Sequence, residues 1–200
     1  MDARAMRILF VDVETDGLPI RHNILEHPDW PHIVQAAWIV SDGLGNILRS
    51  ASRIVKPVGF NIPADAVAVH GITTKMAREQ GTEPQTVLHV LNREIERAGL
   101  IVAHNLDFDS NVINAESKRF GLPCSILSKK GYCTMKNTKD LTQLGFPDNP
   151  YPNEWKWPSW RNCTAISLAT ISVALTMLVQ MSAPASIVSG NYCESNGYKK

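Results

Sequence analysis

The run from Arg7 to Val13, RILFVDV, is the feature that most limits what this chain can fold into. A short, mostly apolar run with several β-branched residues is typical of a strand buried inside a sheet. Two acids, Asp12 and Glu14, stand at the end of this strand, two positions apart. Residues at that spacing on a strand point to the same face, so the sequence predicts paired carboxylates beside an apolar core.

The paired carboxylates predict a divalent cation site. Two like charges next to an apolar run repel each other and lose hydration, and a cation relieves both costs. Hard oxygen ligands favour Mg²⁺ or Mn²⁺. A solvated strand end that leads into a turn is the alternative interpretation of an Asp-x-Glu pair. The longer string VDVETDGLP, residues 11–19, is far more specific than the acidic pair alone.

The rest of the first 120 residues alternates strand and helix signals and predicts an α/β fold. Residues 42–46, DGLGN, have turn chemistry between two strand candidates, so we expect a hairpin and a sheet that begins antiparallel. Thr82 can cap a helix that has Pro84 in its first turn. The expected strands are 32–41, 47–56 and 100–103, and the expected helices are 63–69, 73–80, 84–97 and 106–120.

A second polar cluster follows the strand candidate 100–103. His104 and Asn105 come directly after it, and Asp107 and Asp109 then begin a helix. Acids in a first helical turn interact favourably with the helix dipole, which would explain both aspartates without any function. His104 and Asn105 can equally be a strand-end and capping pair. Taken alone, this cluster leaves the structural and the functional interpretation open.

Together the two clusters match a known pattern. Residues 11–17, VDVETDG, resemble the first motif of the DEDD (DnaQ-like) family of 3′→5′ exonucleases, and residues 103–109, AHNLDFD, resemble its second motif. The string VHGIT at residues 69–73 looks like the family's His-Gly-Ile loop. The family includes the proofreading epsilon subunit of bacterial DNA polymerase III. The resemblance covers about residues 6–158, which we take as the exonuclease domain.

The resemblance implies a ribonuclease H-like mixed sheet, with the first three strands antiparallel and the next parallel, flanked by helices. It implies that Asp12, Glu14 and Asp109 are catalytic residues that hold two Mg²⁺ or Mn²⁺ ions. It also implies a nucleic-acid 3′ end as the substrate, most of all in single-stranded DNA. A DNA polymerase is a candidate partner. The residues expected to contact the substrate are Thr15, Gly17, Leu18, His70, His104 and Asn105.

The tail, residues 159–200, lacks the third motif, His-x-x-x-x-Asp, that such an enzyme needs. No histidine follows His104 and no aspartate follows Asp148. A one-base frameshift near Ser159 would explain this, because the shifted frame can encode LEELYRHLFG and later HDAGADVSA, which contains the missing motif. A membrane segment over residues 165–181 is the alternative, but five polar side chains there argue against it.

The sequence therefore predicts a metal-dependent 3′→5′ exonuclease domain, impaired because the base histidine and the fourth aspartate are absent. The alternative is a non-catalytic nucleic-acid-binding module or an inactive, truncated remnant. The net charge of +1 gives no general signal for polyanions. Lys129, Lys130, Lys136 and Lys139 could contact phosphates, or could simply belong to a solvated loop. The four cysteines form no CxxC pair and no secretory signal is evident, so we expect a cytoplasmic protein without a membrane anchor.

Overall fold

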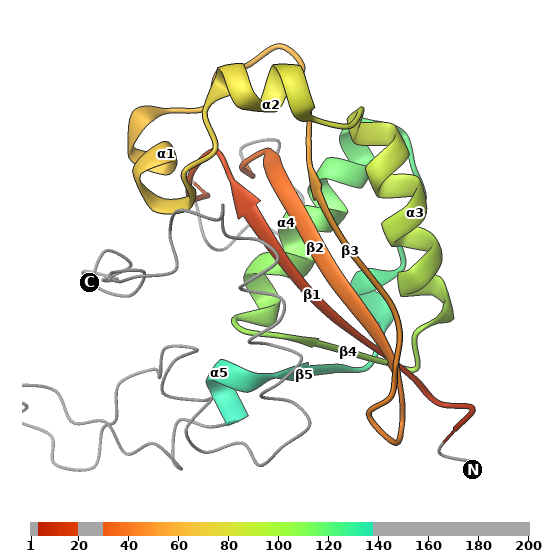
Figure 1. Ribbon diagram of the computed structural model, residues 1–200. Helices are drawn as coiled ribbons and strands as arrows, with labels where there is room; N and C mark the ends of the chain where they lie inside the picture. Colours follow the sequence, from red (N-terminus) through yellow and green to blue (C-terminus); the bar gives the residue numbers. More distant parts are fainter. Residues whose placement is uncertain (1–3, 20–29, 138–200) are drawn as a thin grey trace, which may run out of the picture.

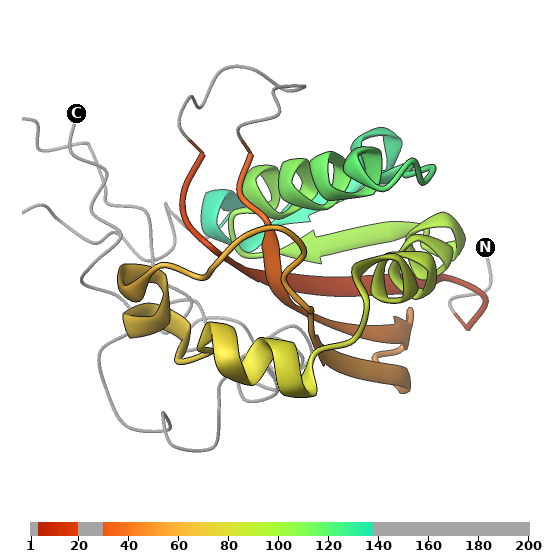
Figure 2. The ribbon, with the colours of Figure 1, turned by 90° about the horizontal axis from the view of Figure 1, so that it is seen from above.

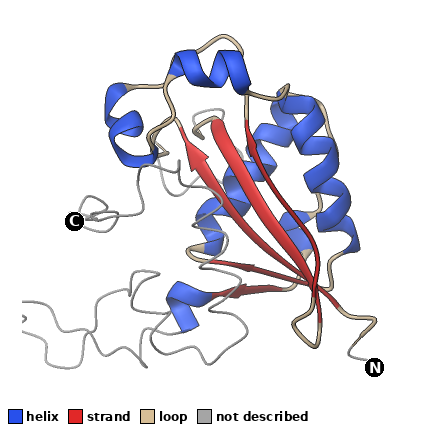
Figure 3. Cartoon of the chain, viewed as in Figure 1, coloured by secondary structure: helices blue, strands red, loops and turns tan. Residues whose placement is uncertain are grey.

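The computed structural model describes residues 4–19 and 30–137. They form a five-stranded sheet in the order β3-β2-β1-β4-β5, with helices packed around it (Figure 1). The predictions for the tail, including the frameshift and the membrane alternative, lie outside the described residues. The α/β class is confirmed, and Figure 3 shows its helices and strands.

The sheet is mixed, as the family resemblance implied. β1 pairs antiparallel with β2, and β2 pairs antiparallel with β3. β4 pairs parallel with β1 on its other side, and β5 pairs parallel with β4. The short β5 was not predicted. The strands are β1 (Arg7–Thr15), β2 (Ile33–Asp42), β3 (Ile47–Ile54), β4 (Leu100–Ala103) and β5 (Gly131–Cys133).

The longer helices, α3 and α4, lie on one face of the sheet, while α1 and α2 lie beyond the end of β1 (Figures 1 and 2). The predicted helices all form, within one residue at each end. A 3₁₀ turn and a one-turn helix were not predicted. The helices are α1 (Ala64–His70), α2 (Thr74–Gln80), α3 (Pro84–Arg97), α4 (Leu106–Arg119) and α5 (Thr134–Asn137), and the 3₁₀ turn is η1 (Ile126–Ser128).

The alternation of β1 sorts its side chains between the two faces of the sheet. Leu9, Val11 and Val13 belong to the main core, which also contains buried residues of α3 and α4. Phe10 belongs to a smaller buried cluster with residues of β2 and β4. Asp12 and Glu14 continue the Phe10 side of the strand, so the acidic pair extends an apolar face, as the spacing predicted.

The expected role of Thr82 is wrong. The N-cap of α3 is Glu83, and no side chain caps this helix. Thr82 instead forms an isolated parallel bridge with Val55. Its N–H donates to the Ile54 carbonyl at 2.8 Å, and its carbonyl accepts from Lys56 N–H at 2.9 Å. The backbone of Thr82 is therefore used to extend the edge of β3, which a local capping rule cannot detect.

Candidate active site

The site is built where β4 stops short of the end of β1. β4 pairs with β1 only over Ile8–Phe10, and the chain then leaves the sheet to begin α4. This leaves the following part of β1 open on the β4 side. Asp109, in the first turn of α4, occupies that position: its Oδ1 accepts a hydrogen bond from Val13 N–H at 3.1 Å. The second motif is therefore joined directly to the first.

Asp12, Glu14 and Asp109 are close enough to affect one another's ionisation. Burial, and then the charge of Asp12, raises the pKa of Glu14 to about 8. Burial raises the pKa of Asp109 well above its ordinary value, with further contributions from the charges of Asp12 and Glu14 and an opposing one from Val13 N–H. The three acids that the sequence singled out therefore lie within electrostatic range of one another.

The donor chemistry of this cluster fits a hard divalent cation, since all three side chains offer carboxylate oxygens. A cation would offset the burial and the mutual repulsion that raise the two pKa values. Within residues 4–19 and 30–137, however, no three His, Cys, Asp or Glu side chains stand close enough together to coordinate one ion. The metal site therefore stays a prediction supported by the chemistry of its donors.

The segment Thr15–Leu18 leaves β1 with its backbone held by a local turn. The Thr15 hydroxyl donates to the Gly17 carbonyl at 2.6 Å. Among the described residues Gly17 faces open space, because a Cβ added there would meet none of their atoms within 4 Å. Leu18 is 61% exposed although it is apolar. An uncovered backbone beside an exposed apolar side chain can receive the flat face and the sugar of a nucleotide.

His70, the last residue of α1, is buried and packs against the first motif. Its Nδ1 accepts from Ile72 N–H at 3.0 Å, so the neutral ring carries its hydrogen on Nε2. Nε2 makes no hydrogen bond within the described residues. Burial lowers the pKa of His70, and the nearby Thr15 backbone opposes that shift. The imidazole of the His-Gly-Ile loop is therefore neutral and buried beside the Thr15 backbone at the end of β1.

Asn105 has an unusual backbone conformation at the start of α4. Its φ of 68° is positive, and no other non-glycine residue of the described part shares that sign. Its side chain makes no capping hydrogen bond, so the capping interpretation is wrong for Asn105. His104 is held by a different contact, because its Nδ1 lies 2.9 Å from the Thr134 hydroxyl. Asp107 lies outside the acidic cluster and forms an ion pair with Lys136 at the surface.

Residues 9–151 match the exonuclease family known as RNase_T. The chain belongs to this family of DEDD exonucleases. An uncharacterized exonuclease, CP81, of Escherichia phage 186 is 30% identical over 131 residues, which are 64% of this chain and 59% of the phage protein. The chain therefore spans less than two thirds of the length of this relative.

Solved structures of exonuclease I have the same fold. The chain matches E. coli exonuclease I in complex with a dA16 oligonucleotide with a TM-score of 0.64 and 17% identity, over 88% of this chain and 40% of the other. A zinc-bound complex of the E. coli enzyme with single-stranded DNA matches with a TM-score of 0.64 and 18% identity, over 88% of this chain and 38% of the other. At such identities the likeness establishes the fold, and it confirms the ribonuclease H-like class.

The basic residues of this chain are partly engaged in structural contacts. Lys129 Nζ donates to the carbonyls of Glu96 at 2.6 Å and Ala98 at 3.2 Å, at the carboxyl end of α3. Lys136 pairs with Asp107. These contacts favour the structural interpretation of both side chains, while Lys139 lies outside the described residues. In the described part of this chain, no helix has both the length and the apolar character to cross a membrane.

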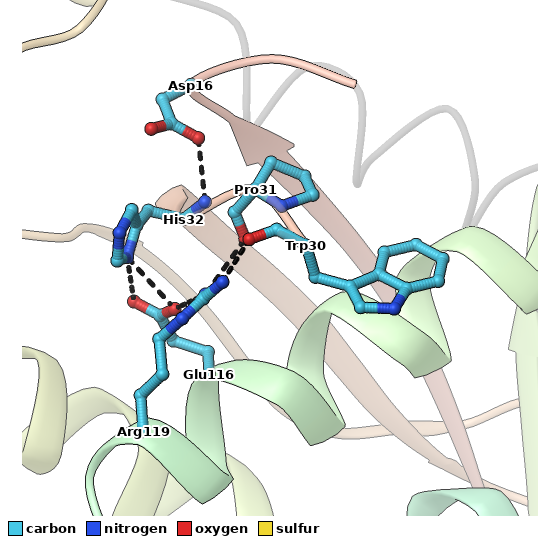
Figure 4. A network of polar contacts seen from close by, with 6 residues as sticks. All are labelled: Asp16, Trp30, Pro31, His32, Glu116 and Arg119. Carbon is cyan, nitrogen blue, oxygen red and sulfur yellow. Dashed lines mark hydrogen bonds and ion pairs between the residues drawn. The ribbon is translucent and has the colours of Figure 1, made fainter. Parts of the chain in front are cut away.

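Sequence reasoning missed one polar network beside the site. Glu116 and Arg119, on α4, contact each other and the segment Trp30–His32 that enters β2 (Figure 4). Glu116 is 1% exposed. A glutamate on an inward-facing position of a predicted helix, followed three residues later by an arginine, was a signal that could have been used, because buried charges are almost always paired.

Proposed function

We propose that this chain is a metal-dependent 3′→5′ exonuclease domain that releases nucleotides from single-stranded DNA ends, with activity reduced by the absent third motif. The observation that carries the proposal is that Asp12, Glu14 and Asp109 lie within electrostatic range of one another, with Asp109 hydrogen-bonded to the backbone of the first motif. Exonuclease I, whose fold the chain shares, has been solved with single-stranded oligonucleotides, which supports the choice of substrate.

Asp12, Glu14 and Asp109 would hold Mg²⁺ or Mn²⁺, ideally two ions as in the family. When bound, the cation lowers the pKa of water and offsets negative charge on the scissile phosphate. The protein's own groups would orient the 3′-terminal nucleotide. Thr15, Gly17 and Leu18 offer an open turn and an exposed apolar side chain, and the buried His70 supports this turn from beside the Thr15 backbone. His104 and Asn105 would shape the second motif.

The proposed impairment follows from the missing base. His-x-x-x-x-Asp supplies the base and the fourth carboxylate in the family, and the tail has neither residue type. Loss of a general base costs about 10²–10⁴-fold in rate. His70 is the nearest substitute by chemistry, but its lowered pKa makes it a weak base. If the coding DNA carries a frameshift near Ser159, a corrected chain regains this factor; a shifted frame with an early stop would exclude that explanation.

The decisive experiment follows an oligonucleotide labelled at either end. With Mg²⁺ or Mn²⁺, we expect slow release of mononucleotides from the 3′ end, and loss of that release in Asp12→Ala. Release that persists in Asp12→Ala, or that begins at the 5′ end, would contradict the proposal. Binding of the oligonucleotide without any metal-dependent release would favour the alternative, a non-catalytic binding module.

Finer assignments rest on the resemblance alone. The likeness to the epsilon subunit suggests a DNA polymerase as a partner, which a pull-down with a replicative polymerase tests. The substrate could also be an RNA 3′ end, which parallel assays on DNA and RNA oligonucleotides of one sequence distinguish. Cys124 and Cys133 are free thiols, and Cys163 and Cys193 lie outside the described residues, so the cytoplasmic location stays a prediction.

A further inference from the structure

A polar network closes the base of the long connection between β1 and β2. At one side, Asp16 N–H donates to the His32 carbonyl at 3.1 Å, and His32 N–H donates to Asp16 Oδ1 at 2.7 Å. At the other side, His32 Nδ1 lies 3.3 Å and 3.4 Å from the two carboxylate oxygens of Glu116 (Figure 4). These contacts therefore join the two ends of the connection, Asp16 and His32, to each other and join His32 to α4.

Arg119 completes the network with its planar guanidinium. Its Nη1 donates to Glu116 Oε2 and to the Pro31 carbonyl, the latter at 3.2 Å, and its Nη2 donates to the Trp30 carbonyl. One side chain thus holds both a carboxylate and the backbone that enters β2 (Figure 4). An arginine can do this because its donors are fixed in one plane, whereas a lysine offers a single charged nitrogen on a flexible stem.

We propose that Glu116 and Arg119 are positioning residues, which hold the Asp16 end of the first motif in register with the second motif. This inference rests on the proposed function, since the register matters only if the two motifs act on one nucleotide. Glu116 comes about two helical turns after Asp109, so both side chains leave α4 on the same side. The same helix therefore carries one acid to β1 and another to the segment that fixes the turn after β1.

One further contact joins the network to the second motif, and another holds the His32 ring in place. The Trp30 ring packs against Phe108, the neighbour of Asp109, with ring centroids 6.5 Å apart. The His32 ring stacks on Phe60 at 4.3 Å and 9°, which fixes the imidazole beside Glu116. Asp16, in turn, lies two residues after Glu14. Segment Trp30–His32 is thus a short bridge between the first motif and α4.

The molecule contains a matched control for this proposal. Glu94 of α3 is 6% exposed and pairs with Arg49 of β3 at 3.1 Å, so it too is a buried glutamate held by an arginine. Its partner lies on β3, at the opposite edge of the sheet from β5. Glu116→Gln and Glu94→Gln make the same chemical change. Both are expected to reduce stability, while only the first acts on the turn after β1.

The first test measures amide hydrogen exchange of the full chain, residue by residue. We expect Glu116→Gln to speed exchange at the amides of Asp16 and His32 by about 10-fold or more, since opening free energies there depend on local contacts. Glu94→Gln should leave these two amides unchanged. Arg119→Lys, a milder change, should give a smaller acceleration at the same amides. Equal exchange in Glu116→Gln and Glu94→Gln would overturn the proposal.

The second test measures affinity for a fluorescent single-stranded oligonucleotide with Mg²⁺, and kcat and KM for its hydrolysis. A displaced binding segment can cost up to about 100-fold, and we expect Glu116→Gln to lower affinity by about 10-fold, with Arg119→Lys between it and the unaltered chain. If Glu116→Gln loses affinity and activity only in proportion to the fraction of molecules that remain folded, as we expect for Glu94→Gln, the positioning role is contradicted. An unaltered chain that binds no oligonucleotide contradicts the proposed function, and the exchange measurement then decides the inference by itself.

Discussion

The two ends of β1 carry carboxyl groups in opposite electrostatic conditions. At its start, Asp42 of β2 pairs with Arg7 in the strand register. The Asp42 carboxylate accepts hydrogen bonds from the N–H groups of Leu44 and Asn46, both at 2.9 Å, and from the Asn46 side chain at 2.8 Å. These bonds, with the Asn46 side chain first, lower the pKa of Asp42. At the other end of β1, the pKa values of Glu14 and Asp109 are raised.

The difference separates a structural carboxylate from the carboxylates that we propose to be functional. The turn around Asp42 provides enough donors to satisfy its charge, so the ionised form stabilises the fold. At the far end, the N–H groups of Val13 and of Asp109 itself favour the ionised form of Asp109, while burial and neighbouring acids oppose ionisation. A group of acids that the protein itself does not favour in the charged form is typical of a site that awaits a cation or a substrate.

Isosteric substitutions at Asp109 and Asp42 should affect different properties: the first should lower nuclease activity, and the second should lower thermal stability. The loss of activity in Asp109→Asn is the largest effect we expect. Asp109→Asn keeps the oxygen that accepts from Val13 but removes the charge. We expect at least about 100-fold lower nuclease activity, because metal stabilisation of the reacting phosphate contributes several kcal/mol. Thermal unfolding of the metal-free chain should be unchanged or shifted upward, since a buried charge is removed.

Asp42→Asn is the counterpart at the other end. It should lower the thermal midpoint, because the carboxylate loses charge-assisted hydrogen bonds from the turn. Nuclease activity per folded molecule should not change. If Asp109→Asn destabilises the chain as much as Asp42→Asn while activity survives, the distinction between the two ends is wrong.

The pH dependence of stability should also differ in sign between the two ends. Because the pKa of Glu14 is about 8 in the folded chain and near 4.5 when unfolded, the folded state binds the extra proton. Stability of the metal-free chain should therefore fall as pH rises from about 4.5 to about 8. Glu14→Gln should remove roughly 1–3 kcal/mol of that decline, after allowance for partial exposure. Denaturant unfolding at several pH values measures it.

Asp42 provides the opposite slope for comparison. Its pKa is lowered from 3.8, so the stability it contributes is present above about that value and is lost in more acidic solution. Asp42→Asn should therefore flatten the acid side of the stability curve, and Glu14→Gln the neutral side. A Glu14→Gln chain with an unchanged decline between pH 4.5 and 8 would show that other groups cause it.

The sequence predicted the scaffold and the acids better than the contacts that position them. RILFVDV and the apolar face of α3 specify their elements locally, so their bounds followed from pattern and end signals. The meeting of Asp12 with Asp109 was available from the family resemblance. β5 is only Gly131–Cys133, too short to show a period, and it forms because β4 offers a parallel edge. The His32–Glu116 contact joins residues 84 apart, which no local rule detects.

Substitutions of Asn105 distinguish two roles for this residue, which are to adopt the left-handed backbone conformation or to contact the substrate. With φ at 68°, Asn105→Ala should lower the free energy of unfolding by about 1–2 kcal/mol, whereas Asn105→Gly should change it little. If the side chain contacts the nucleotide, both variants lose oligonucleotide affinity to a similar extent. Full affinity in Asn105→Gly would instead assign the residue a purely conformational role. Chemical unfolding and fluorescence anisotropy distinguish these outcomes.

The smallest expected effect on stability is at Gly17, where the site end of β1 faces open space. A Cβ there meets nothing within 4 Å and φ is not positive, so Gly17→Ala should leave stability unchanged or raise it by up to about 1 kcal/mol. Gly81→Ala is the contrasting case, because its Cβ would lie 2.2 Å from the Ala77 carbonyl oxygen and must destabilise the chain.

Nothing inside the described part of the protein requires a glycine at position 17. A fall in oligonucleotide affinity in Gly17→Ala, without any loss of stability, would therefore mean that the bare backbone is needed by something outside the protein, as expected if the 3′-terminal nucleotide approaches it closely. Unchanged affinity would move the nucleotide away from this turn and leave Leu18 and His70 as the groups to test.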